Sequence, residues 1–160
     1  MPWLLVGLFG ALLAADIVGA FEQQLQANVM LAFFIPGIVY LADAVGTQTE
    51  ALVIRDLSVG VPIGRVVRSE ILTGLFVGLA LALAFFPLGW WRWGDENMVV
   101  AVALAILAAC ATASAIALTL PWFLNRLGID PAFGSGPLAT VIQDLLSVII
   151  YLGIATAMLS

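Results

Sequence analysis

The sequence contains no histidine, no lysine and a single cysteine, and only 9% of its 160 residues are charged. Without histidine, an imidazole metal site and histidine-dependent catalysis are excluded. Cys110 has no partner cysteine, so an internal disulfide is excluded as well. Five cations, all Arg, face ten acids, which gives a formal net charge of −5. A nucleic-acid-binding protein needs a basic patch, and this composition provides none.

Apolar residues dominate the composition. They make up 64% of the chain, and the mean hydropathy is +1.18. A soluble domain is about 45–50% apolar and about 25% charged. The composition therefore predicts an integral membrane protein embedded in a lipid bilayer.

Five stretches are long and apolar enough to cross a bilayer, which takes roughly 20 residues per helix. We expect an all-α membrane fold of one transmembrane domain over residues 1–160, with no composition change that would mark a second domain. The expected spans are residues 2–20, 27–45, 71–89, 98–120 and 137–159.

The arginines orient these spans. With the N-terminus inside, the inner loops hold four Arg residues and the outer loops hold one, which fits the positive-inside rule. The four are Arg55, Arg65, Arg68 and Arg126, and the one is Arg92. The sequence thus predicts a multi-pass protein of the cell membrane, with a cytoplasmic N-terminus and an extracellular or periplasmic C-terminus.

An acid interrupts the last apolar stretch. An ionisable side chain at the bilayer centre costs about 2.5–3.5 kcal/mol on insertion scales, and such residues usually face a bundle interior or a water-filled path. Helical spacing places Thr140, Asp144, Ser147 and Tyr151 on one face. Asp144 is therefore the first candidate for a functional site, although a hydrogen bond to a neighbouring helix would be an alternative reason for it.

A second polar face is predicted at the inner end of the second stretch. Asp43, Thr47 and Glu50 are spaced by four and three residues, and Gly46 beside them lets another backbone approach. Two acidic stripes favour hard cations such as Mg²⁺ or Ca²⁺. The alternative is that Asp43 and Glu50 are simply hydrated near the membrane surface.

At this point the motifs resemble the membrane domain of MgtE-type magnesium transporters. The matching features are Pro36, the segment "GTQT" at 46–49, the segment "VIRDL" at 53–57, and the stretch "LNRLGIDPAFGSGPLATVIQDLLSVIIYLGIA" at 124–155. The chain departs from the family's pattern at Ala44, where an Asn is usual. This departure leaves the choice of ion and its coupling open.

The resemblance implies a homodimer with an ion path between its subunits, lined by the second and fifth helices. It implies that Asp144 of both subunits binds a hydrated Mg²⁺, and that Asp130 matches an acid in the inner loop before that helix. Thr140, Asp43 and Glu50 join these two as the candidate metal residues. Mg²⁺ dehydrates reluctantly, so contact through its waters suits both binding and release.

Three functions remain open from the sequence: Mg²⁺ transport through a dimeric pore, a Na⁺- or H⁺-coupled Mg²⁺ exchanger, and a non-conducting membrane interaction subunit. No nucleophile paired with a base is present, so we do not expect an enzyme. The family's soluble Mg²⁺-sensing domains are expected to be absent, since the first span follows almost at once on Met1. The chain would then be a short homologue or an excised piece, and a separate soluble regulatory partner is possible.

Overall fold

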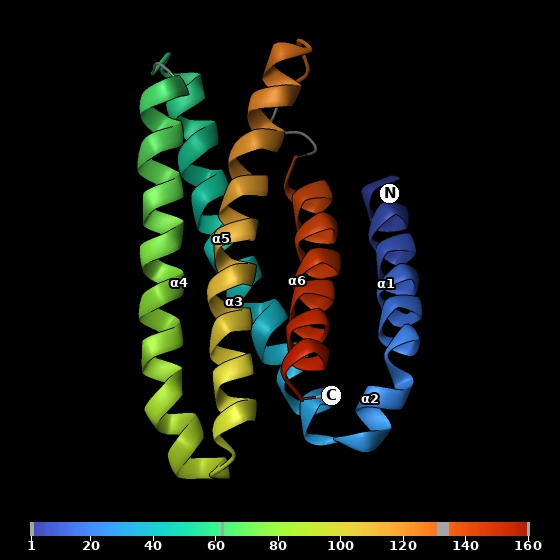
Figure 1. Cartoon of the computed structure of the whole chain (residues 1–160). Helices are drawn as coiled ribbons and strands as arrows, with labels where there is room; N and C mark the ends of the chain where they lie inside the picture. The colour runs from blue at the N-terminus through green and yellow to red at the C-terminus, as the bar shows by residue number, and fades with distance from the viewer. Residues whose placement is uncertain (1, 62, 131–134, 160) are drawn as a thin grey trace.

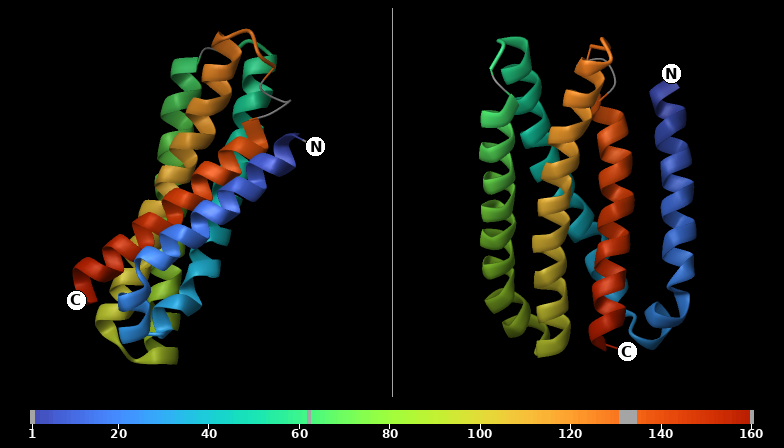
Figure 2. Two further views of the ribbon diagram at one scale, coloured as in Figure 1. Left: turned by 90° about the vertical axis from the view of Figure 1, so that its right-hand side faces the viewer. Right: turned by 45° about the horizontal axis from the view of Figure 1, so that its top comes forward.

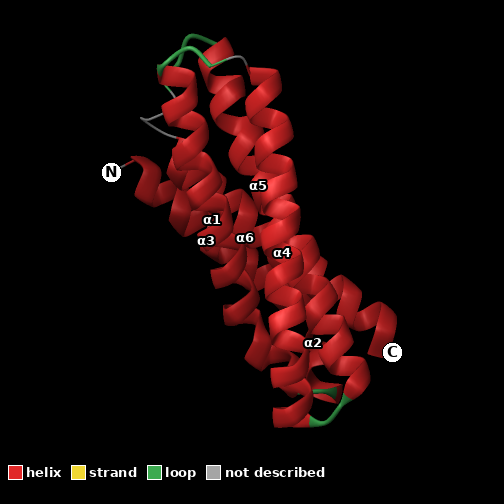
Figure 3. Ribbon diagram, turned by 90° about the vertical axis from the view of Figure 1, so that its left-hand side faces the viewer, coloured by secondary structure: helices red, strands yellow, loops and turns green. Residues whose placement is uncertain are grey.

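The described residues of the computed structural model, 2–61, 63–130 and 135–159, form a bundle of α-helices (Figure 1, Figure 3). The helices are α1 (Pro2–Ala20), α2 (Glu22–Ala27), α3 (Met30–Ser58), α4 (Ile63–Trp93), α5 (Glu96–Arg126) and α6 (Ser135–Leu159).

The helices end where the sequence offers local stop signals. Gly60 and Gly94 follow α3 and α4 with φ of 74° and 70°, a left-handed conformation that glycine adopts without strain. Asp95 then caps α5, since its side chain accepts a hydrogen bond from the Met98 backbone N–H at 3.1 Å. A tight connection between α4 and α5 results.

Four helices are long and apolar enough to cross a membrane, namely Met30–Ser58, Val66–Trp93, Glu96–Arg126 and Ser135–Leu159. A shorter apolar helix is found at Leu4–Ala20. The expected span at residues 27–45 is longer than predicted, because α3 continues without a break to Ser58. Most of the segment 46–70, expected to connect two spans, is therefore helical.

Successive long helices run in alternating directions (Figure 1). The start of α1, the α3–α4 connection and the start of α6 lie at one end. The α1–α2–α3 connection, the α4–α5 connection and the end of α6 lie at the other. Helix α5 packs against α3, α4 and α6, whereas α1 packs mainly along α6 at the edge of the bundle (Figure 2).

Small residues let α4 and α5 approach closely. A side chain at Gly74 would collide with Ser114, and one at Gly78 would come within 3.1 Å of the Cys110 Cβ atom. We call this contact, Gly74 and Gly78 against Leu107, Cys110 and Ser114, the α4–α5 seam. The Gly74 and Gly78 pair therefore serves packing inside one chain, as small residues at this spacing commonly do in membrane helices.

Candidate functional site

Polar side chains meet where α3 and α6 run antiparallel. The start of α6 lies beside the later part of α3, and near the other end of α6 the Tyr151 hydroxyl donates a hydrogen bond to the Leu31 carbonyl near the start of α3. We call this contact the α3–α6 seam and define it by three pairs and one adjoining acid: Glu50 with Ser135, Asp43 with Thr140, Gly46 with Gln143, and Asp144.

Asp43 and Thr140 join the two helices directly. The Thr140 hydroxyl donates a hydrogen bond to Asp43 Oδ1 at 3.2 Å, across residues that are 97 positions apart in the chain. Asp144 lies one turn further along α6, half-buried, and its carboxylate is near enough to repel that of Asp43. A cation that entered here would be attracted by both carboxylates.

Gly46 makes room for the Gln143 side chain. A Cβ atom at position 46 would collide with the Gln143 amide. Gln143 is 2% exposed, and its Nε2 donates to the backbone carbonyl of Ala113 on α5 at 3.3 Å. This amide therefore ties α3, α5 and α6 together beside Asp144.

Glu50 closes the seam at the start of α6. Its side chain is 7% exposed and is hydrogen-bonded by Ser135. Its Oε1 atom is buried and has no hydrogen-bond partner among the described residues, and a Cβ atom added to Gly136 would stand 3.9 Å from it. Asp43 adds a second negative charge in the neighbourhood. This carboxylate oxygen can accept a hydrogen bond from the water shell of a cation, or it can bind a proton.

The structure does not gather every predicted residue in one place. Asp43, Thr140, Asp144 and Glu50 all border the α3–α6 seam, as described above. Thr47, which its spacing groups with Asp43 and Glu50, is exposed.

Asp130 is also exposed, after the end of α5, where it lines a different cavity. This cavity has a volume of about 440 Å³ and includes Ser58 and Asn125 in its wall. It lies at the end of the bundle where α3 and α5 terminate.

No group of three or more acidic or cysteine side chains within residues 2–61, 63–130 and 135–159 is close enough to hold a metal ion directly. The seam's carboxylates are spread along the helices instead. What this arrangement offers is a row of oxygen atoms inside an apolar bundle, suited to contact through water.

Sequence reasoning missed Gln143 and Ser135. Each stands near a predicted residue, and a search restricted to ionisable groups passes over a neutral amide and a hydroxyl. The available signal was helical spacing, since Gln143 follows Thr140 by three residues. It also missed Glu70 on α4, which is 8% exposed and has one carboxylate oxygen, Oε2, without a partner among the described residues.

Known proteins are similar to this chain over most of its length. The family model described as "MgtE: Divalent cation transporter" matches residues 35–154. Similar proteins are the Magnesium transporter MgtE of Bacillus subtilis (strain 168), 37% identical over 98% of this chain, and that of Enterococcus faecalis, 33% identical over 98%. The protein of the same name from Thermus thermophilus is 29% identical over 98%. The chain spans about a third of the length of these relatives, 35–36%.

Proposed function

The chain belongs to the MgtE family of divalent cation transporters, and from this premise we propose that it carries Mg²⁺ across a membrane along the α3–α6 seam. The observation that supports the proposal best is the seam itself. Three acids and a threonine border one helix contact inside a bundle that is mostly apolar. Buried acids in membrane helices are costly, and they commonly mark ion pathways.

The ion keeps its water shell in this proposal. Mg²⁺ demands octahedral geometry and dehydrates reluctantly, so Asp144 accepts hydrogen bonds from its waters rather than ligating it. Weak contact of this kind also permits release, which conduction requires. Thr140 holds Asp43 in place through the 3.2 Å hydrogen bond, and Asp43 adds negative charge beside Asp144.

A second copy of the chain completes the path. One chain presents a single Asp144 at one side of the proposed path, and a second copy would supply a facing carboxylate. Two copies related by a two-fold axis, the commonest oligomeric symmetry, would place two Asp144 carboxylates opposite one ion. The pore of this proposal therefore lies at a homodimer interface lined by α3 and α6 of both copies.

The whole of residues 1–160 acts as one transmembrane domain in this proposal, with α1 as the fifth span. Its 19 residues reach about 28 Å at 1.5 Å per residue, close to the roughly 30 Å hydrocarbon core. The N-terminus faces the cytoplasm, because Arg55 and Arg126 lie in the last turns of α3 and α5, and Arg92 in that of α4 at the opposite end. Asp130 then stands at the cytoplasmic mouth.

A coupled exchanger is the second candidate, and Glu50 favours it. A buried carboxylate with a partnerless oxygen could take up the coupling Na⁺ or H⁺. A non-conducting interaction subunit is the third candidate, and a separate soluble regulatory partner is compatible with each of the three.

Reconstitution into liposomes loaded with a Mg²⁺-sensitive dye tests the proposal. A channel should admit Mg²⁺ down its own gradient alone, and the rate should respond to membrane potential. An exchanger should need an opposing Na⁺ or H⁺ gradient. No Mg²⁺ entry under any of these gradients, from protein that melts cooperatively, would reject transport by this chain.

A further inference from the structure

Two apolar grooves flank the C-terminal part of α5, on the face of the bundle where α5 lies between α4 and α6 with α3 behind it (Figure 1). The groove between α4 and α5 has a volume of about 250 Å³, and the groove between α5 and α6 has a volume of about 280 Å³. Thr119 and Trp122 line both grooves and so form their common wall. A ligand with two apolar arms could therefore place one arm on either side of this wall.

The walls of both grooves are apolar. The α4–α5 groove is lined by residues such as Val67, Ile71 and Leu118, and the α5–α6 groove by residues such as Leu120, Phe123 and Ile142. Thr119 adds no free hydroxyl to them, because its Oγ1 atom donates to the Ala115 carbonyl at 2.8 Å within α5. Grooves of this kind favour hydrocarbon chains as their occupants.

An arginine stands at the end of the wall that the grooves share. Thr119, Trp122 and Arg126 are spaced by three and four residues, so they form one ridge along α5. The Arg126 Cζ atom lies 5.0 Å from the centroid of the Trp122 ring. A guanidinium that stacks on a ring uses its flat face, and the N–H groups at its edge can still bind a phosphate.

A second arginine reaches the same end of the bundle from α4. Arg68 is exposed and precedes Ile71 by three residues, so it lies on the face of α4 that borders the first groove. Helix α4 begins and α5 ends at this end of the bundle (Figure 1). The ion pair found among the described residues joins Arg55 to Asp56 and involves neither of these arginines. Tryptophan and arginine together are typical of the level at which lipid headgroups lie.

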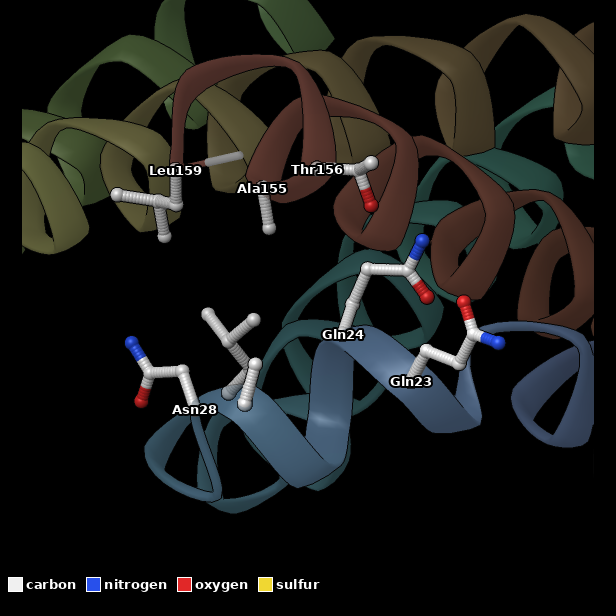
Figure 4. Close-up of a pocket in the computed structure, with 8 residues that line it drawn as sticks. Gln23, Gln24, Asn28, Ala155, Thr156 and Leu159 are labelled. Carbon is white, nitrogen blue, oxygen red and sulfur yellow. The ribbon is translucent and has the colours of Figure 1, made fainter.

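Other hollows of the bundle lack this combination of apolar walls and nearby positive charge. The groove further along α4 and α5, lined by residues such as Leu83 and Leu104, is apolar, but none of its described lining residues has an arginine within one helical turn. The cavity between α2 and the end of α6 is lined by polar side chains such as Gln24 and Thr156 and by no charged residue (Figure 4). The grooves beside Trp122 are therefore the ones suited to a charged lipid.

This face of the bundle lies away from the proposed pore. Ile142 lines the α5–α6 groove and precedes Asp144 by two residues. At about 100° per residue, the two side chains lie on roughly opposite sides of α6. A homodimer that brings two Asp144 side chains together therefore leaves both grooves open to the bilayer.

We propose that the two grooves bind one anionic diacyl phospholipid, with one acyl chain on either side of Trp122 and the phosphate against Arg126 and Arg68. Basic pockets between transmembrane helices bind anionic headgroups, because each arginine attracts the net negative charge. The acyl chains add contact with the apolar walls. The site is separate from the α3–α6 seam, and its occupancy does not depend on Mg²⁺ transport.

Native mass spectrometry of the purified protein in a neutral detergent measures the lipid bound per chain. Dioleoyl-phosphatidylglycerol should bind about tenfold more tightly than dioleoyl-phosphatidylcholine, whose headgroup has no net charge. Lyso-phosphatidylglycerol keeps the charge but has one chain, so it should bind at least about tenfold more weakly than the two-chain lipid. Equal binding of the two dioleoyl lipids would overturn the role of the arginines. Equal binding of the one-chain lipid would overturn the two-groove arrangement.

Arg126→Gln should weaken the binding of dioleoyl-phosphatidylglycerol about fivefold, and adding Arg68→Gln should weaken it about fivefold again. The matched control is Arg92→Gln, at the opposite end of the bundle. The Arg92 Cζ atom lies 5.7 Å from the centroid of the Trp93 ring, so this variant removes the same kind of cation–ring contact. It should leave lipid binding unchanged. An equal loss in the Arg92 and Arg126 variants would overturn the site.

Ala115→Phe fills the α4–α5 groove and should weaken the same binding about tenfold, because the ring displaces part of an acyl chain. Ala103→Phe, which fills the apolar groove further along α5, is the matched control and should leave the binding unchanged. Thermal melts in lipid-free detergent check that both variants fold, and the arginine variants decide the site if Ala115→Phe does not. An equal loss in the two phenylalanine variants, or folded wild-type protein that retains no phospholipid, would overturn the proposal.

Discussion

The α4–α5 seam and the α3–α6 seam bring helices together in opposite ways. In the first, Gly74 and Gly78 face the small residues Cys110 and Ser114, and close backbone approach replaces side-chain bonding. In the second, oxygen atoms lie between the helices, and Gly46 admits an amide. The difference shows that glycine in a membrane helix can serve either a dry contact or a polar one.

The residues that stabilise the bundle and the residues that carry its chemistry therefore lie in different helix contacts. Helix α5 holds the apolar core together, with residues such as Met98 and Ile106 fully enclosed. The α3–α6 seam instead carries carboxylates that burial disfavours, a cost that a packed apolar contact avoids. We therefore expect substitutions in the α3–α6 seam to alter transport first, and those in the α4–α5 seam to alter folding first.

The largest effect is expected at Asp144. Asp144→Asn and Asp144→Ala should each lower Mg²⁺ flux about tenfold to a hundredfold, because a charge-assisted hydrogen bond to the ion's waters is lost. Dye-based uptake into liposomes measures this, beside a thermal melt. Asp16→Asn, an exposed acid on α1, is the control. If Asp144 is only structural, Asn should transport normally and Ala should lose about 0.6 kcal/mol of stability.

Gly74→Ala probes the α4–α5 seam. The new methyl group collides with Ser114, so the helices must separate, at a cost of about 1–3 kcal/mol. Thermal unfolding in detergent should show the loss, and adding Ser114→Gly should restore most of it. Gly7→Ala, where a methyl group meets nothing within 4 Å, is the matched control. Equal melting of the two alanine variants would show that the seam is not tightly packed.

Thr140→Val removes one polar link of the α3–α6 seam and keeps the shape of the side chain. The loss of the hydrogen bond to Asp43 should cost about 0.6 kcal/mol, the average for such bonds in a membrane. Thr119→Val, which loses only a bond within its own helix, should cost less. The same melts decide this, and a larger loss at Thr119 would refute the link.

Ser114→Ala should have the smallest effect, and its sign is the informative part. The Ser114 hydroxyl is buried, with no hydrogen-bond partner among the described residues. Its removal relieves an uncompensated polar group, so stability should stay the same or rise slightly. A clear loss of stability would reveal a polar bond in a seam that we describe as dry.

The membrane class, the family and most spans could be predicted from the sequence, because long apolar runs and local motifs carry that information. The end of α3 at Ser58 could not be placed, since the polar stretch around Gln48 and Thr49 resembles a loop by composition, whereas in the fold it is helical.

Helical spacing grouped Asp43 with Glu50 on one helix and singled out Asp144 on another. Each of these predictions needs only the geometry of a single helix. Spacing could not pair Asp43 with Thr140 or Gly46 with Gln143, since those contacts depend on the register between two helices. Thr47, which its spacing groups with Asp43 and Glu50, is exposed in the single chain.

Locating the ion itself tests the central claim most directly. We propose a crystal structure of the assembled protein with Mn²⁺ in place of Mg²⁺, in which anomalous scattering marks the metal. The account predicts a peak on a two-fold axis between two copies of Asp144, with carboxylate oxygens about 4 Å from the metal because a water lies between them. A peak away from Asp144, or copies whose Asp144 side chains face apart, would contradict it.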